Sequence, residues 1–464
     1  MQVLQTIFDW ILSLGAAVFV PVIMLVAGLI VRMKWKDAIS SAITLGVAFT
    51  GMSMLIGFMT GAIEPAAKAM MERTGIELSI IDGGWTSMAS ISWTWPFAFA
   101  VFPLQIVVNI IMLALKKTDT FNADLWNVWG KIFTAFIIEA VVTPFLGRVV
   151  AIILAFVVAA FQIIMELKSA DVHQHRVEKL TGIPGVTCTH KMNFFAAVMF
   201  PFDLLLRKIP ALNKPIDAAK MREKLGIFSE NHIIGFILGI LFGIVAGFSV
   251  ADTLGLAIKA ATALMLFPII TKLFMQALSP ISEAISDYMN KRFAGRKLFV
   301  GIDWPFLGGA NEIWLVIIIA IPFTLLWAAI LPGNNILPFA GIINISLVVP
   351  IYLLTKGNTP RMLILSILGI PAFLWVGTAF APMITDLGRM TGALDIPAGS
   401  MISNSSIDGP VFTYAFSHIF KFLEGNFIPL IIAVLWCTSF FFYCRELRKE
   451  QKEDMAAATE ASAG

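Results

Sequence analysis

Charged side chains are scarce in this 464-residue chain, and their scarcity decides its class. Asp, Glu, Lys and Arg make up 14% of the residues, whereas hydrophobic residues make up 58%. A soluble domain carries about 25% charged residues, so the composition excludes an ordinary soluble protein. The net charge of +3 gives no basis for a nucleic-acid partner.

Cysteine is also scarce, and the three present are Cys188, Cys437 and Cys444. Their spacing matches neither a metal site nor a disulfide framework. The chain also lacks a glycine-rich phosphate loop, so we expect no bound nucleotide, no metal and no other cofactor. Met1 to Trp10 lacks the basic start of a signal peptide, and the apolar run after it is long enough to span a bilayer.

What the chain does have is a series of long apolar runs. Many reach the 18 or more residues needed to cross about 30 Å of hydrocarbon. We therefore expect an all-α polytopic membrane protein with about eleven transmembrane helices. They are predicted near residues 12–31, 38–60, 92–115, 129–146, 149–166, 231–249, 253–274, 311–331, 338–354, 361–382 and 427–444. Residues 192–206 are predicted to form either a twelfth span or a re-entrant hairpin.

The sequence also repeats itself at a distance of about 215 residues. The amphipathic stretch 62–74 precedes a β-like segment, Glu77 to Asp82, and the stretch 278–293 precedes a second one, Lys297 to Asp303. A long apolar helix broken by a proline follows each, at Pro103 and at Pro322. The alternative to a repeated membrane-embedded unit is that these stretches are interfacial helices and ordinary loops.

Five spans in each copy is an odd number, so the copies must point in opposite directions. This predicts a first repeat with a re-entrant hairpin (1–225), an inverted second repeat (226–425), a final helix (426–444) and a cytoplasmic tail (445–464). Inverted repeats are typical of transporters, whose substrate sites lie near the bilayer midplane between the copies. The tail is too short for a signalling domain, which disfavours a sensor.

Lysine and arginine are distributed unevenly along this topology. If the N-terminus lies outside, most of the 33 fall on the inner side, including the basic segment from Lys168 to Lys224. The outer side keeps Lys68, Arg73, Arg148, Lys259, Arg389 and Lys421. The positive-inside rule therefore predicts an external N-terminus and a cytoplasmic C-terminus.

Several ionisable residues lie where a membrane interior would otherwise exclude them. Asp303 ends the second β-like segment, where it either binds substrate or caps the helix that begins near Asn311. Glu139 lies in the middle of a span, where it either faces a cavity or pairs with Arg148. Asp82 and Thr86 flank Trp85, and a carboxylate beside an indole suits the polar and apolar sides of a sugar.

His190 ends a segment, Gly182 to His190, that is rich in glycine, proline and hydroxyl groups and includes Thr189. The second copy offers an equally polar segment, Gly399 to Pro410. The repeated context favours a hairpin tip that dips into the bilayer and brings Thr189 and His190 to a site. The alternative is that His190 is structural.

These residues carry a resemblance to the membrane subunit, enzyme IIC, of bacterial phosphotransferase-system (PTS) sugar permeases. The family is the galactitol family, in the superfamily shared with the ascorbate permease. The resemblance covers about residues 5 to 450, and its strings are Glu64 to Met70, Asp124 to Trp129, Gly301 to Asp303 and Pro332 to Phe339.

The resemblance implies a homodimer in the bacterial inner membrane that imports a sugar or polyol. A cytoplasmic IIB protein, itself served by IIA, would phosphorylate the substrate from a phosphocysteine, so this chain would carry no phosphoryl intermediate. It assigns the substrate carboxylate to Asp303, the site histidine to His190, and polar contacts to Asp82 through Thr86 and to Thr134. We also expect contacts from Trp85, Glu139, Thr189, Asn311 and Phe339, with Asp303 and His190 as the catalytic pair.

Two departures from the family pattern fall where ligand contacts are expected. The first hairpin reads Val186 to Thr189 where galactitol-type members have Pro-His-x-Thr, and Gly130 replaces the histidine that follows Trp-Asn-x-Trp. The substrate can therefore differ from galactitol. The alternative function is an ion-coupled secondary transporter in which Glu139 or Asp303 carries a proton.

Overall fold

The computed structural model describes residues 32–75, 78–124, 126–183, 185–214, 216–292, 298–394, 396 and 398–463, together with 18, 21–22, 25–26 and 28–29. The span predicted at 12–31 lies largely outside these residues.

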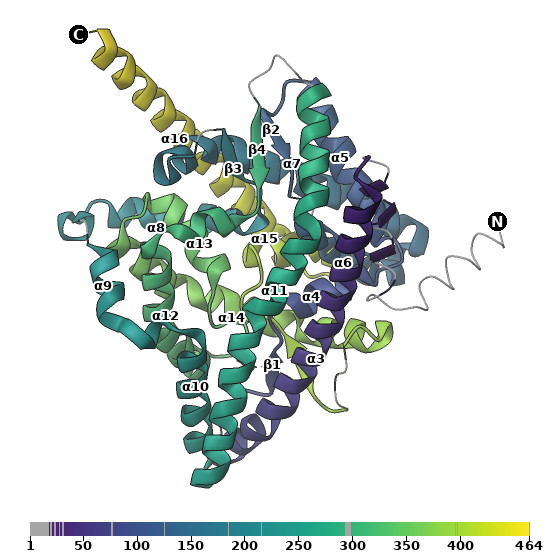
Figure 1. Cartoon of the computed structure of the whole chain (residues 1–464), viewed down its shortest axis with the longest axis vertical. Helices are drawn as coiled ribbons and strands as arrows, with labels where there is room; N and C mark the ends of the chain where they lie inside the picture. The colour runs from purple at the N-terminus through teal and green to yellow at the C-terminus, as the bar shows by residue number, and fades with distance from the viewer. Residues whose placement is uncertain are drawn as a thin grey trace, which may run out of the picture.

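Helices dominate the first half of the described chain (Figure 1). Its elements are α3 (Trp35–Thr74), β1 (Ile80–Asp82), α4 (Gly84–Trp93), α5 (Ala98–Ala114), β2 (Thr120–Asn122), η1 (Trp126–Val128), α6 (Trp129–Leu146), α7 (Arg148–Thr181), β3 (Val186–Cys188), η2 (Lys191–Asn193), α8 (Phe194–Leu206), η3 (Pro210–Asn213), α9 (Ala218–Leu225) and η4 (Gly226–Ser229).

The second half has the same character. Its elements are α10 (Asn231–Ala246), α11 (Val250–Arg292), β4 (Phe299–Ile302), η5 (Trp304–Gly309), α12 (Asn311–Ile330), β5 (Ile336–Leu337), α13 (Ile345–Thr355), α14 (Thr359–Thr391), β6 (Met401–Ser403), α15 (Pro410–Ser417), η6 (Ile419–Glu424) and α16 (Ile428–Ala463).

The apolar helices confirm an all-α membrane protein, although fewer clear spans emerge than the eleven expected. By length and composition, five of the described helices can cross a bilayer, and a sixth span results if the bent pair α4 and α5 is counted as one. At 13 residues, α8 is about 20 Å long and too short to cross, which favours re-entry for 192–206.

Several predicted boundaries need correction. The amphipathic stretches 62–74 and 278–293 are not separate interfacial helices, because residues 62–74 and 278–292 continue α3 and α11. The first-copy break lies between α4 and α5, where the axis bends by 97°, and not at Pro103, which is inside α5. Pro322 does not break α12. α16 continues as a helix into the expected tail.

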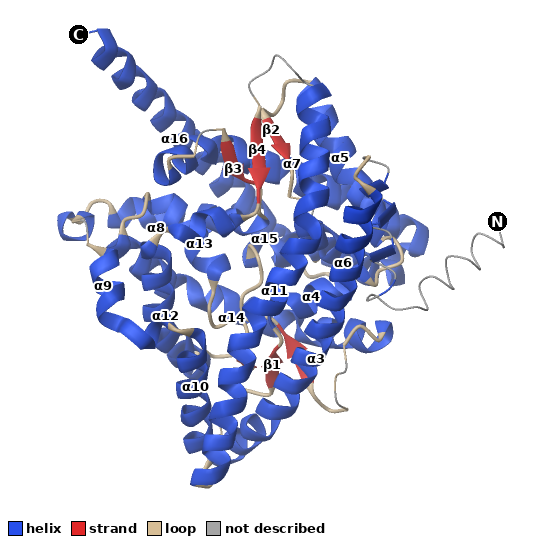
Figure 2. Ribbon diagram, viewed as in Figure 1, coloured by secondary structure: helices blue, strands red, loops and turns tan. Residues whose placement is uncertain are grey.

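Six short strands form two parallel sheets, and each sheet combines the two halves of the chain. In the first sheet β1 pairs with β5 and β6, with Asp82 opposite Ser403. In the second sheet β4 pairs with β2 and β3, with Gly301 opposite Asn122 and Thr187. Each half thus gives one central strand to a sheet whose two outer strands come from the other half. Figure 2 shows the two groups of strands apart from each other among the helices.

The helices pack in groups around these sheets. α3, α10 and α11 contact one another, and α3 and α11 run side by side across the molecule in Figure 1. α6 packs on α4 and α7, while α14 contacts α12, α13 and α15. The hydrophobic core continues through these elements, and the polar loop segments at the strand ends lie inside it.

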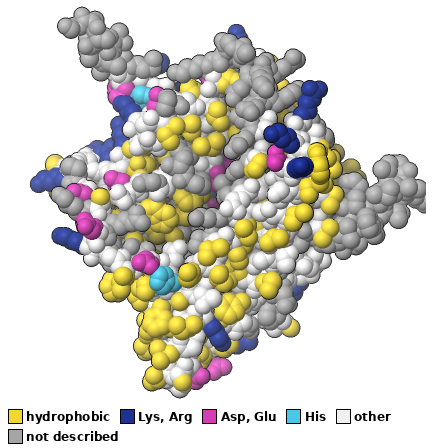
Figure 3. Space-filling model, viewed as in Figure 1, with side chains coloured by type: hydrophobic (Ala, Val, Ile, Leu, Met, Phe, Trp, Pro, Cys, Tyr) yellow, Lys and Arg dark blue, Asp and Glu magenta, His cyan; other side chains and the backbone are white. Residues whose placement is uncertain are grey.

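The surface separates apolar from basic regions. Figure 3 shows hydrophobic side chains over the lower part of the face that α3, α10 and α11 occupy, and many of the Lys and Arg side chains toward the upper and left edges. Met54, Val250 and Ile258 are among the exposed apolar residues, at 72%, 79% and 60%. Such extended apolar faces suit contact with lipid.

Candidate substrate site

The carboxyl ends of β2, β3 and β4 bring three polar segments together. Because the strands are parallel, the residues that follow them meet at one edge of the sheet. Asn122 ends β2, Thr189 and His190 follow β3, and Asp303 follows β4. Thr189 donates to the Asn122 side-chain oxygen at 2.9 Å, which ties the β2 and β3 ends together.

Gly301 makes this close approach possible. A Cβ atom on Gly301 would lie 2.2 Å from Cγ2 of Thr189 and 3.0 Å from Cγ2 of Thr120. Real side chains do not approach so closely, so position 301 in this central strand requires glycine. The glycine thereby sets the place of Asp303 two residues later.

His190 presents one ring nitrogen to two carboxylates. Its Nδ1 accepts from the Met192 backbone N–H at 3.1 Å, so in the neutral ring the proton lies on Nε2. Nε2 is 3.8 Å from Asp303 and 3.9 Å from Asp408. These gaps exceed a hydrogen bond, and a ligand hydroxyl that accepts from Nε2 and donates to a carboxylate would bridge them.

Asp303 has a double role. Its Oδ1 accepts from the Trp304 backbone N–H at 2.7 Å and caps η5, not the helix that begins at Asn311. It also faces His190 from a loop outside the spanning helices. Burial, followed by the charge of Asp124, raises the pKa of Asp303 well above its usual range. Burial lowers the pKa of His190, which favours the neutral ring.

A buried polar network supports this edge from α6 and α7. Asp124 accepts from the Asn127 side chain at 2.7 Å, and Lys131 donates to the Asn127 carbonyl at 3.3 Å. Lys131 forms an ion pair with Glu166 at 2.5 Å. Thr134 joins the network through Gln162, which donates to Glu166. Thr134 is therefore part of the support of the site.

Aromatic faces and unpaired polar atoms lie near the network. The Trp85 and Trp129 rings stack with centroids 6.2 Å apart. Buried side-chain polar atoms normally find partners. Within the described chain, however, the buried side-chain atoms without a hydrogen-bond partner include Thr86 Oγ1, Asn122 Nδ2, Asn193 Oδ1 and Lys191 Nζ. A ligand rich in hydroxyl groups could supply acceptors and donors to them.

Asp82 holds the corresponding position in the other sheet, but its oxygens are already occupied. They accept five hydrogen bonds: from the backbone N–H groups of Gly84, Phe339, Gly341 and Ser405, and from the Ser405 hydroxyl. Asp82 is fully buried. It therefore joins the loops after β5 and β6, whereas Asp303 is shown with one backbone donor, on Oδ1, the oxygen that also lies 3.8 Å from His190 Nε2.

Three other predicted contacts lie elsewhere or serve packing. Glu139 pairs with Arg148 at 2.8 Å and accepts from the Trp95 indole at 2.5 Å, which is the pairing alternative stated above. The buried Phe339 ring packs near Phe242 on α10. Asn311 is the first residue of α12. These placements do not bring the three residues to the His190 ring.

Residues that the sequence interpretation passed over complete the cluster. Asp408 lies within the polar segment Gly399 to Pro410, and Lys191 directly follows His190. Glu166 and Lys131 are ionisable residues on apolar helices, so the criterion that selected Glu139 would have found them. Asp408 accepts from Ser346 and faces His190, which adds the β6 segment to the site.

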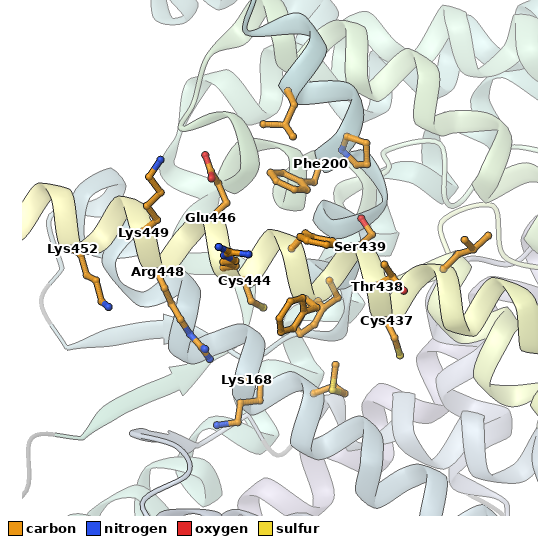
Figure 4. Close-up of a pocket in the computed structure, with 18 residues that line it drawn as sticks. Lys168, Phe200, Cys437, Thr438, Ser439, Cys444, Glu446, Arg448, Lys449 and Lys452 are labelled. Atoms are coloured by element: carbon orange, nitrogen blue, oxygen red, sulfur yellow. The ribbon is translucent and has the colours of Figure 1, made fainter.

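A separate groove lies between α7, α8 and α16. Its volume is about 1310 Å³, and its lining is mostly apolar. Figure 4 shows Phe200, Cys437 and Cys444 beside it and Lys168, Arg448, Lys449 and Lys452 toward one end. The residues that line it differ from those of the polar cluster, so this groove is not the candidate site.

Comparisons with known proteins agree with this picture. A family model described as "PTS system sugar-specific permease component" (EIIC-GAT) matches residues 10–399. The chain is 28% identical over 459 residues to the "PTS system galactitol-specific EIIC component" of Escherichia coli strain K12, covering 98% of this chain and 99% of that protein. It is 29% identical over 446 residues to a "Putative permease IIC component" of the same strain, covering 95% and 99%.

Proposed function

Since the chain belongs to the EIIC-GAT family of PTS sugar-specific permease components, we propose that it binds and translocates a sugar or polyol of the galactitol type. It then presents the substrate to a cytoplasmic IIB protein, which IIA recharges. The main support for this proposal is the group formed by His190, Asp303 and Asp408. These residues follow β3, β4 and β6, strands that pair between the two halves of the chain and are called exchanged strands below.

The geometry supports a division of roles in phosphoryl transfer. A substrate hydroxyl attacks phosphorus of the IIB phosphocysteine, an O–P bond forms, the S–P bond breaks, and the cysteine leaves as a thiolate. Asp303 in its ionised form accepts the hydroxyl proton through Oδ2, since its backbone donor binds Oδ1. His190 Nε2 donates to the substrate and holds it beside Asp303.

The cysteines of this chain are poor candidates for a phosphoryl carrier. A carrier must react as a thiolate. Burial raises the pKa of Cys188, on β3, to about 12. Cys188 is therefore a poor carrier, and in the proposed mechanism the phosphoryl group passes from IIB directly to the substrate.

The membrane architecture is part of the same proposal. The exchanged strands support two inverted repeats, 1–225 and 226–425, followed by a final helix from 426 to 444 and a tail from 445 to 464. The N-terminus lies outside, and the tail lies in the cytoplasm of a bacterial cell. The working unit is a homodimer in the inner membrane.

The chemical form of an imported substrate tests the function. Cells that express the chain receive radiolabelled galactitol, mannitol or sorbitol, with and without the cognate IIB protein. We expect a phosphate ester inside only when IIB is present. Accumulation of free hexitol without IIB, abolished by collapse of the proton gradient, would instead show an ion-coupled secondary transporter.

A further inference from the structure

Lys191 is a buried cation that the roles above leave unexplained. It opens η2 directly after His190 and is 4% exposed. Its Nζ has no hydrogen-bond partner among the described residues. A buried ammonium without an acceptor is costly, so its persistence points to a partner that arrives with a ligand.

The space around this ammonium is shaped by a glycine and an indole. Nζ lies over the Trp129 ring, 5.9 Å from its centroid, and Trp129 stacks on Trp85. A Cβ atom on Gly130 would lie 3.4 Å from Nζ. A longer side chain at position 130 would therefore compete with Lys191 for the same place.

The charges nearby link Lys191 electrostatically to the polar cluster. Burial and the charge of Lys131 disfavour its ammonium form, whereas the carboxylates of Asp408 and Glu166 favour it. Glu166 is already paired with Lys131 at 2.5 Å, whereas Asp408 faces the His190 Nε2. Asp408 thus links the ammonium electrostatically to the His190 ring.

We propose that Lys191 Nζ donates a hydrogen bond to a hydroxyl oxygen of a neutral polyol, in a subsite for which Gly130 provides the room. This inference rests on the proposed function and specifies its substrate class. Lys191 and Gly130 together determine which polyol is accepted.

The chemistry of the hydroxyl group explains the preference for a neutral ligand. A hydroxyl can accept from Lys191 and at the same time donate to a carboxylate such as Asp408. A carboxylate or phosphate on the ligand would place a further negative charge beside Asp408. The subsite therefore selects polyols over the corresponding acids.

Direct binding measurements on the purified full-length protein test this subsite. Isothermal titration compares galactitol, mannitol and sorbitol with galactonate and gluconate. We expect a hexitol to bind more tightly than either acid. Lys191→Met should weaken binding of that hexitol about 10- to 100-fold, as expected for loss of a charged hydrogen bond.

A matched control and a second variant keep the test decisive. Lys259→Met removes an exposed lysine on α11 and should leave affinity unchanged. Gly130→His should displace the ammonium and weaken binding, yet add little in the Lys191→Met background. Unchanged affinity in a monodisperse Lys191→Met protein, fully additive losses, or tighter binding of an acid would each overturn the subsite.

Measuring IIB-dependent phosphorylation in the same preparations distinguishes failure of the Lys191 subsite from failure of the proposed function. If the wild type forms hexitol phosphate and Lys191→Met does so with an unchanged KM, the function stands and the subsite is wrong. If the wild type forms no phosphate ester from any of the three hexitols, the proposed function fails, and the subsite fails with it.

Discussion

Asp82 and Asp303 hold corresponding positions in the two sheets, and replacing them one at a time should show which carboxylate stabilises the fold and which serves phosphorylation. Asp82→Asn places an NH2 group against backbone donors at a fully buried position. One carboxylate oxygen accepts two hydrogen bonds and the other accepts three, so the amide loses at least two in either orientation. At about 1.5–3 kcal/mol for each bond to a charged acceptor, the loss is about 3–6 kcal/mol.

Asp303→Asn is the matched control, because the asparagine oxygen can keep the hydrogen bond from the Trp304 N–H. We expect this variant to lose less than about 1.5 kcal/mol of stability. Its phosphorylation of substrate should nevertheless fall by about 100-fold or more, since the proton acceptor is gone.

Thermal unfolding of the detergent-purified proteins, followed by intrinsic tryptophan fluorescence, measures the contrast. The midpoint of Asp82→Asn should fall well below that of Asp303→Asn. Equal midpoints, or a fall confined to Asp303→Asn, would refute the assignment of Asp82 to structure and Asp303 to the site.

Three further predictions concern individual contacts. Glu139→Gln should leave IIB-dependent uptake intact, since the Arg148 side chain that pairs with Glu139 is 61% exposed; abolished uptake would favour proton coupling. Lys131→Met should destabilise the protein by about 3–5 kcal/mol in thermal or denaturant unfolding, because Glu166 is left buried and unpaired, and adding Glu166→Leu should restore much of the loss. Gly301→Ala should abolish phosphorylation and lower the unfolding midpoint; a fully active variant would show that the strands are less tightly packed.

The sequence predicts the helices of this fold better than its sheets. Apolar runs reveal α6, α7, α12, α14 and α16, because lipid leaves few alternatives to a helix. The β-like segments that contain β1 and β4 are also visible in the sequence. Their partners are not, because β2, β3, β5 and β6 have two or three residues each and pair across the two halves.

The candidate site was predictable in part for a related reason. Asp303 and His190 attract attention as polar groups in apolar surroundings, and the structure places them 3.8 Å apart. Asp82 attracts the same attention, but only the fold reveals its five donors. Asp408 lies near His190 because the pairing of β6 with β1 positions its segment, and no local sequence pattern predicts that contact.

The exchanged strands also impose an order on synthesis. The sheet that holds β4 can close once residue 302 has emerged, but β1 must wait for β6, which ends at residue 403. At about 5–20 residues per second, Asp82 remains without its Ser405 donors for roughly 15 to 65 s. During this interval the sheet centred on β1 is incomplete, because both of its outer strands come from the second half. Its maturation is therefore a late step, controlled by the last strand to arrive.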